Sequence, residues 1–280
     1  MLRDRLIIGA IGTVIAVAVL LLGELVLGVI VSVLALMALT EMFSALGFFK
    51  KNIPLAVIGY IAGAVILILN VLSGNAINYL LLTPLCFELL IAFMIVLFVY
   101  MVLSHRKTTF SDVAMCMFVT FYVTEFFSCL ILIRYGFNGE LMIWVPLIIA
   151  WLSDTMAYTF GRLFGKHKLI PEVSPKKTVE GAIGGVFGGI AFMCVFGLVC
   201  MNFFDKHVNW LNIVILGGVG AVLSQFGDLA ASWIKREQGV KDYGSILPGH
   251  GGIMDRFDSV LVVAPFVYFT ATTVFPIFFN

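Results

Sequence analysis

The sequence predicts an all-α, polytopic integral membrane protein with about nine transmembrane helices. Hydrophobic residues occupy 61% of its 280 positions. Charged residues occupy only 12%, about half the share that is usual in a soluble domain. Apolar stretches of about 20 residues, the length that crosses a bilayer core, recur along the chain. The few positive charges gather in the segments between those stretches.

Nine segments qualify as spans, and the first is retained as a membrane helix because no small-residue cleavage site precedes the second. The connections are short except for two polar loops, 162–180 and 234–256. We expect the spans at 5–22, 25–47, 53–72, 79–103, 110–133, 141–161, 181–203, 211–233 and 257–278.

The distribution of positive charge predicts the orientation of the chain. If the nine spans alternate, 15 of the 17 Lys and Arg residues lie on one side, and only Arg134 and Lys206 lie on the other. By the positive-inside rule, the N-terminus and both polar loops are then cytoplasmic. We therefore expect a protein of the plasma membrane whose polar loops face the cytoplasm.

Composition also excludes some classes of function. A net charge of +1 argues against a polyelectrolyte partner, so no nucleic acid is expected. The five cysteines lie in apolar segments without C-x-x-C spacing, which favours buried small hydrophobic residues over a metal or disulfide role. Glycines at four-residue steps on span 181–203 predict a face where a neighbouring helix packs closely; they are Gly181, Gly185 and Gly189, and Gly184 and Gly188.

Acidic residues inside predicted spans are the first sign of a site. Asp154 and Asp228 lie several residues from the nearest span end, where an insertion scale assigns a charge a cost of about 2.5–3.5 kcal/mol. Such residues usually face a polar cavity. Asp228, Ser232, Lys235 and Arg236 have the spacing of one helix face, which runs from an acid within the membrane to two cations at its surface.

Two more acids open the last span and complete a set that is typical of a magnesium site. Asp255 and Asp258 are three residues apart, and capping of a helix N-terminus is an alternative explanation for Asp255. Carboxylates that converge from separate helices favour a divalent cation, and Mg²⁺ takes one or two carboxylates with water and substrate phosphates. No Cys/His cluster offers a zinc site instead.

The segment SPKKTVEG, residues 174–181, predicts a helix start with Ser174 as N-cap and Pro175 in the first turn. Lys176 and Lys177 would then lie where the helix dipole disfavours cations, with Glu180 as partial compensation. A bound phosphate would compensate better. The alternative is that both lysines are interfacial and simply obey the positive-inside rule.

The stretch KDYGSILPGHGGIMDRFDS, residues 241–259, adds glycines whose backbone N–H groups can approach an anion, notably Gly251 and Gly252. Lys241 and Arg256 add positive charge, while His250 is either part of the site or an ordinary loop hydrogen-bonder. Acids for Mg²⁺, cations for phosphates and a site open to lipid predict phosphoryl or nucleotidyl transfer onto a lipid head group.

Two alternatives stay open on the residues alone. A secondary transporter would also place acids in the membrane, and Glu88 and Glu125 favour it most. Against it, the charge collects at one face and no internal repeat is visible. A related enzyme that acts on another lipid would share the nucleotide-binding residues, since the acceptor pocket cannot be recognised from sequence.

Residues 232–258, SWIKREQGVKDYGSILPGHGGIMDRFD, closely resemble the signature of the phosphatidate cytidylyltransferase (CDP-diacylglycerol synthase) family and match every fixed position of it. The resemblance extends to GDL at 227–229, SPKKTVEG at 174–181 and SDTMAYTFGR at 153–162. It implies Mg²⁺-dependent transfer of CMP from CTP to phosphatidic acid, which yields CDP-diacylglycerol and pyrophosphate. Met156 and Ala231 depart from the usual pattern, and Ala231 leaves the site one carboxylate short. A related enzyme, either a CTP-dependent polyprenol kinase or an ether-lipid synthase, stays open as an alternative to this activity.

The resemblance also implies roles for individual residues. Asp228 and Asp255 would be metal ligands, with Asp258 and Asp154 near the same centre and K⁺ as a second cation. Residues 141–280 would form the catalytic part with spans six to nine, and residues 1–140 would supply packing, lipid access or contacts of a homodimer. The implied binders of nucleotide and substrate are Ser174, Lys176, Lys177, Glu180, Ser232, Gly251 and Gly252; the implied catalytic polar lining is Lys235, Arg236, Lys241, His250 and Arg256.

Overall fold

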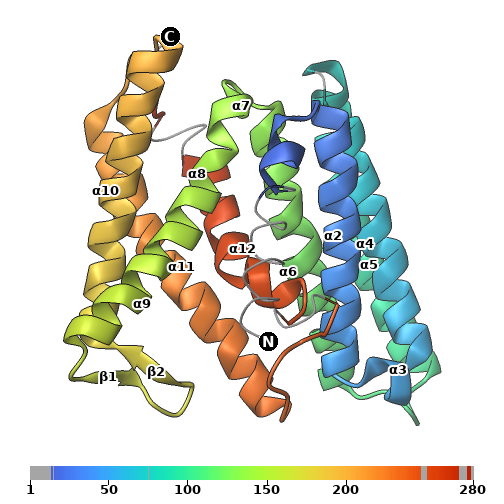
Figure 1. Ribbon diagram of the computed structural model, residues 1–280. Helices are drawn as coiled ribbons and strands as arrows, with labels where there is room; N and C mark the ends of the chain where they lie inside the picture. Colours follow the sequence, from blue (N-terminus) through green and yellow to red (C-terminus); the bar gives the residue numbers. More distant parts are fainter. Residues whose placement is uncertain (1–13, 15, 75, 247–250, 271–275, 279–280) are drawn as a thin grey trace. The chain divides into compact units, whose positions relative to one another are not determined.

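The computed structural model describes residues 14, 16–74, 76–246, 251–270 and 276–278, which are almost entirely helical (Figure 1). The chain divides into two compact units. Unit 1 comprises Met1–Tyr135 together with Val240–Asp255, and unit 2 comprises Gly136–Gly239 together with Arg256–Asn280. The first division lies near the predicted boundary at residue 140. The segment Val240–Asp255 belongs to unit 1, although its sequence continues the second polar loop.

Unit 1 is a bundle of long apolar helices, in which α2 and α4 both pack against α6. Its described helices are α2 (Glu24–Ala45), α3 (Phe48–Lys51), α4 (Ile53–Leu72), α5 (Ala76–Leu103) and α6 (Phe110–Tyr135). Leu39, Phe43 and Phe127 are fully buried between these helices. Gly59 and Gly63 bring α4 close to α6, since a Cβ at either would lie 2.7 Å from a threonine side chain of α6.

Helix α4 shows why hydropathy alone does not reveal which face packs. Leu55, Ile66 and Leu67 are buried on one side. Equally apolar residues on the other side are exposed and repeat every three or four positions, as expected of a face that contacts lipid: Ile53, Val57, Ile61, Val65, Ile68 and Leu72. A helix that is apolar all round is a membrane span by composition, and its packed face is decided by its neighbours.

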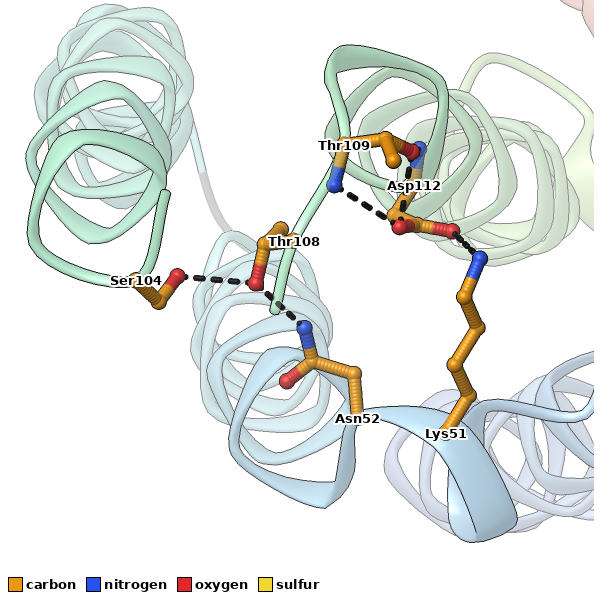
Figure 2. Close-up of polar contacts among 6 residues, drawn as sticks. All are labelled: Lys51, Asn52, Ser104, Thr108, Thr109 and Asp112. Carbon is orange, nitrogen blue, oxygen red and sulfur yellow. Dashed lines mark hydrogen bonds and ion pairs between the residues drawn. The ribbon is translucent and has the colours of Figure 1, made fainter. Parts of the chain in front are cut away.

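The helix starts at one end of unit 1 are joined by a polar network (Figure 2). Thr109 and Asp112 form a reciprocal cap of α6: Asp112 Oδ2 accepts from Thr109 N at 2.9 Å, and Thr109 Oγ1 accepts from Asp112 N at 3.2 Å. Lys51 donates to Asp112 Oδ1 at 2.7 Å. Beside them, Asn52 caps α4 by accepting from Leu55 N at 3.3 Å, a type of contact that contributes about 1 kcal/mol.

Unit 2 begins with a nearly continuous helical segment and continues through a hairpin into two long helices (Figure 1). A π-helical turn, η1, directly precedes the helix that carries Asp154, a kind of irregularity that is frequent at functional sites. The elements are α7 (Gly139–Met142), α8 (Trp144–Leu147), η1 (Ile148–Leu152), α9 (Ser153–Phe164), β1 (Lys168–Ile170), β2 (Ser174–Thr178), α10 (Val179–Phe204), α11 (Trp210–Glu237) and α12 (Met254–Phe269).

The predicted glycine face of α10 is confirmed. A Cβ at Gly189 would lie 2.7 Å from Ala221 Cβ of α11, so the helices approach more closely than any larger residue allows. On the α9 side, Gly184 faces Phe160 and Gly188 faces Met156, each at 2.5 Å from a built Cβ. The absence of a side chain at Gly188 therefore makes room for the unusually large Met156.

Seven predicted spans correspond to helices that are long and apolar enough to cross a membrane. They are Glu24–Ala45, Ile53–Leu72, Pro84–Leu103, Phe110–Tyr135, Gly139–Phe164, Val179–Phe204 and Trp210–Glu237. The spans predicted at 5–22 and 257–278 include residues outside the described ranges and stay predictions. The coarser expectation, a helical polytopic membrane protein, is confirmed by the helices that are described.

The helix start predicted at Ser174 is wrong. Residues Ser174–Thr178 form strand β2, which pairs antiparallel with β1 and places Ile170 opposite Ser174. Helix α10 begins at Val179, and its N-cap is Thr178, whose Oγ1 accepts from Gly181 N at 3.1 Å. Thr178 also fits a strand end because its β-branched side chain favours extended backbone. Lys176 and Lys177 consequently lie in a strand and not in a first helical turn.

Candidate active site

Three helices of unit 2 bring a carboxylate to the same region: Asp154 in the first turn of α9, Asp228 in α11 and Asp258 in α12. Asp258 is 8% exposed, and the negative charges of Asp154 and Asp228 both act on it. Asp154 likewise interacts with the charge of Asp228. Like charges that are held together at low exposure are costly, so the cluster requires neutralising groups or a function that repays the cost.

Ser259 links two of these acids. Its Oγ donates to Asp154 Oδ2 at 3.0 Å, and its backbone N–H donates to Asp258 Oδ1 at 2.8 Å. Ser259 is 2% exposed, so both hydrogen bonds are shielded from water. One buried residue of α12 therefore orients carboxylates that belong to two different helices.

Lysines neutralise part of the cluster. Lys177, at the end of β2, forms an ion pair with Asp228 Oδ2. Ser232, one turn after Asp228, donates to Asp228 Oδ1 at 3.4 Å. The charge of Lys235 acts favourably on Asp258. The predicted shared face of Asp228, Ser232, Lys235 and Arg236 is confirmed for Asp228 and Ser232, which contact each other, and Lys177 of the hairpin joins them.

Gly227 explains the glycine in the GDL segment. A Cβ at this position would lie 2.8 Å from the Asp258 backbone oxygen and 2.9 Å from Val262 Cγ2. Any larger residue would push α11 away from α12 and separate Asp228 from Asp258. The small residue is needed for the close approach of the two acid-bearing helices.

In unit 1, Asp255 acts as a cap. Its Oδ2 accepts from Tyr243 N at 2.9 Å and from Gly252 N at 3.0 Å, and it lies in the first turn of α12. Gly251 has φ of +82°, a left-handed conformation that favours glycine and allows this tight turn. Asp255 thus lies in the first turn of α12, as the capping alternative requires, and its side chain binds the loop that precedes this helix. A role of Asp255 as a metal ligand stays a prediction.

Glu41 is the residue of this region that the sequence analysis missed. It lies in α2, is 4% exposed, and accepts from Ile253 N at 3.0 Å and Met254 N at 2.9 Å. The signal that singled out Asp154 and Asp228, an acid inside an apolar span, also applied to Glu41. It was overlooked because the first five spans were assigned to packing.

The remaining predicted residues vary in placement. Glu180 does not compensate Lys176 or Lys177, since its carboxylate accepts from Lys166 N at 3.1 Å and pairs with His167 Nδ1 at 2.6 Å. Glu125 Oε1 is buried with no hydrogen-bond partner among the described residues. His250 lies outside the described residues. The exposed predicted cations are Lys176, Arg236, Lys241 and Arg256, and Glu88 is also exposed.

The donor chemistry of unit 2 fits a hard cation. Its carboxylates and the Ser259 hydroxyl are oxygen donors of the kind that Mg²⁺ prefers, and their mutual repulsion is what a cation would relieve. Within the described ranges, no three His, Cys, Asp or Glu side chains are arranged around one point as ligands. A cation held here would therefore rely on water or substrate oxygens for part of its coordination.

Apolar helices with acids and lysines gathered among them define a membrane-embedded protein with a polar site for charged ligands. Comparison with known proteins gives the family. A model of the cytidylyltransferase family matches residues 3–274. The chain belongs to this family.

Curated relatives match over nearly the whole chain, and each is named phosphatidate cytidylyltransferase. The protein from Staphylococcus saprophyticus is 38% identical over 266 residues, which cover 94% of this chain and 96% of the relative. One from Staphylococcus epidermidis is 39% identical over 264 residues with the same coverage. One from Staphylococcus aureus is 38% identical over 269 residues, again with that coverage.

Proposed function

We propose that this chain transfers CMP from CTP to phosphatidic acid and releases pyrophosphate. The family and the name of its curated relatives support this activity. The observation that carries it is the cluster in unit 2, where Lys177 pairs with Asp228 beside Asp154 and Asp258. All four residues come from the segments that resemble the family signature or extend it.

Charge determines the chemistry. The attacking phosphate oxygen of phosphatidic acid is already anionic at neutral pH, so it needs no strong general base. It forms a bond to the α-phosphorus of CTP while the bond from that phosphorus to the pyrophosphate oxygen breaks. The barrier arises from bringing one anion to another, and preorganised positive groups lower it. We propose that Lys177 and Lys235 contribute such charge, because they lie beside Asp228 and Asp258. Arg236, Lys241, His250 and Arg256 are proposed as further polar lining.

The proposed magnesium ligands are Asp228, Asp154 and Asp258, and the family signature alone adds Asp255. When bound, the ion would neutralise phosphate charge and help to stabilise the leaving pyrophosphate. Ser259 would hold Asp154 and Asp258 in orientation, and Ser232 would do the same for Asp228. K⁺ is proposed as a second cation. Ser174, Lys176, Glu180, Gly251 and Gly252 stay proposed contributors to nucleotide binding.

We propose nine spans, a cytoplasmic N-terminus and a cytoplasmic active site in the plasma membrane, with homodimer contacts supplied by the first five spans. The distribution of Lys and Arg supports this topology. The ion pair of Lys51 with Asp112 is consistent with this topology, because it brings the segment that carries Lys50 and Lys51 to the end of unit 1 where α6 begins, directly after Arg106 and Lys107. Cysteine labelling of single-cysteine variants from each side of sealed vesicles tests the orientation.

The decisive experiment uses CTP labelled on different phosphates. Purified protein is incubated with phosphatidic acid, MgCl₂ and CTP carrying ³²P at the α or the γ position. Cytidylyl transfer moves the α label into lipid and leaves the γ label in water as pyrophosphate. Transfer of the γ label would indicate a kinase, and label that stays in water, with a working control enzyme, would overturn the proposed activity.

A further inference from the structure

A carboxylate from the first described span holds a loop that follows it by more than 200 residues. Glu41 Oε1 accepts from Ile253 N at 3.0 Å, and Oε2 accepts from Met254 N at 2.9 Å. These N–H groups lie at the start of α12, where helix donors lack intrahelical partners. Both carboxylate oxygens are used, and Glu41 is 4% exposed, so the contact is sealed from solvent.

The loop is shaped around Glu41. A Cβ at Gly244 would lie 2.3 Å from Glu41 Oε1, and a Cβ at Gly252 would lie 2.3 Å from Glu41 Oε2. Neither glycine has a positive φ, so steric room and not backbone conformation explains the missing side chains. Gly244 and Gly252 therefore leave room for the Glu41 carboxylate at two separate positions of the loop.

The same loop is tightened by Asp255. Because Asp255 Oδ2 accepts from Tyr243 N and Gly252 N, it ties the two ends of the segment that also touches Glu41. The described parts of this loop, 240–246 and 251–255, are thus held by Asp255 from within and by Glu41 from α2. They carry Lys241, Gly251, Gly252 and Asp255, all of them proposed to act in nucleotide transfer.

A purely structural cap would not need this arrangement. Three other long helices begin with a cap from a local side chain, which is Asn52 for α4, Thr178 for α10 and Asn209 for α11. At α12 a buried acid from a distant apolar helix binds Ile253 N and Met254 N, in addition to the local contact of Asp255 with Gly252 N. A distant anchor fixes the loop relative to the bundle of unit 1, which a local cap cannot do.

We propose that Glu41 is a positioning residue for the transfer reaction. It fixes the described parts of the loop, 240–246 and 251–255, and with them Lys241 and Asp255. The inference rests on the proposed function. With this role of Glu41, the N-terminal half contributes to catalysis by positioning the loop. The sequence alone had predicted only packing, lipid access or dimer contacts for that half.

Two substitutions test it, with a matched control on the same helix. In Glu41→Gln one amide oxygen still accepts, but the amide nitrogen faces the other N–H; in Glu41→Ala both acceptors are lost. We expect kcat per folded molecule to fall at least tenfold in Glu41→Ala, with Glu41→Gln between it and wild type. Glu24→Gln makes the same chemical change at an exposed position of α2 and should keep wild-type kcat.

The readouts separate positioning from stability. The folded fraction is measured by size-exclusion chromatography in detergent, and kcat is normalised to it. Amide hydrogen exchange should accelerate in peptides that contain Ile253 and Met254 while the rest of α2 stays protected. A kcat within twofold of wild type in Glu41→Ala overturns the proposal; if that variant does not accumulate as folded protein, Glu41→Gln decides by the same criterion.

A double-mutant cycle with Gly244→Ala sharpens the test, since Gly244 has no proposed part in the chemistry. Alone, the added methyl group collides with the Glu41 carboxylate, and we expect kcat to fall about as far as in Glu41→Ala. In the Glu41→Ala background the colliding atoms are absent, so the second substitution should change kcat less than threefold. Additive losses would overturn the proposed link, whereas an inactive wild-type protein in the same assay would refute the proposed function instead.

Discussion

Two polar clusters in this chain differ in how far the charge of their carboxylates is neutralised. In unit 1, Asp112 is matched by Lys51 and by both the backbone and the hydroxyl of Thr109, so its hydrogen-bonding capacity is used locally (Figure 2). In unit 2, the charges of Asp154, Asp228 and Asp258 repel one another although lysines lie nearby. The first cluster ties helices together. The remaining repulsion in the second cluster is what supports its proposed role in binding a charged ligand.

The largest expected effect comes from Asp228. Asp228→Asn keeps the shape but removes the charge that pairs with Lys177 and would hold the cation. We expect kcat to fall by on the order of 10²–10³-fold or more. The Tm in detergent should move by only a few degrees, because the lost ion pair is offset by relieved repulsion. Radiolabel transfer measures kcat, and a thermal-shift assay measures Tm. A robustly active Asp228→Asn variant would contradict the catalytic role proposed for the unit 2 cluster.

Lys177 should come next. Lys177→Met removes the strand cation that pairs with Asp228 while keeping an unbranched side chain of similar length. We expect a loss of roughly 10²-fold in kcat/KM for CTP, since one preorganised charge at the transferred phosphate is lost. Lys168→Met, in the neighbouring strand β1, is the matched control and should remain within twofold of wild type. Equal effects of the two substitutions would mean that the hairpin contributes only general positive charge.

Ser259→Ala tests whether orientation of the acids matters. It removes the hydroxyl donor to Asp154 but keeps the backbone N–H that binds Asp258. Loss of such a supporting hydrogen bond typically costs about 10–100-fold in metal affinity or activity. We expect the Mg²⁺ concentration for half-maximal activity to rise by about tenfold, with recovery of kcat at high Mg²⁺. An unchanged Mg²⁺ dependence would mean that the Ser259 hydroxyl does not support cation binding.

The smallest effect on activity is expected in the unit 1 cluster, where the hydrogen bonds of Asp112 are satisfied locally. Asp112→Asn breaks the pair with Lys51 and weakens the cap of α6, at a cost of about 1–3 kcal/mol in stability. The exposed Lys51 end of the pair is screened by water, which keeps the cost modest. We expect a Tm lower by several degrees and an unchanged kcat per folded molecule. A loss of kcat without a loss of Tm would remove the distinction between the clusters.

Much of the candidate site followed from local sequence. The acids Asp154 and Asp228 are conspicuous because a charge in an apolar span is costly, and seven spans followed from hydropathy alone. The N-cap was misplaced by four residues because a Ser-Pro pair is compatible with a helix start and with a strand, and pairing with β1 decided between them. Glu41 was missed because its partners are backbone N–H groups of a remote segment, which no side-chain pattern reveals.

Hydropathy and charge are properties of short segments, so the sequence by itself determined that the chain is a helical membrane protein and which acids lie in apolar segments. Only the tertiary structure decided which distant groups meet. It brought Lys177 to Asp228, joined Asp154 to Ser259, and set Glu41 against the start of α12. Those contacts depend on how closely the glycine-lined helices approach and on which strands pair. Both are determined by packing between distant segments and not by the sequence of any one segment.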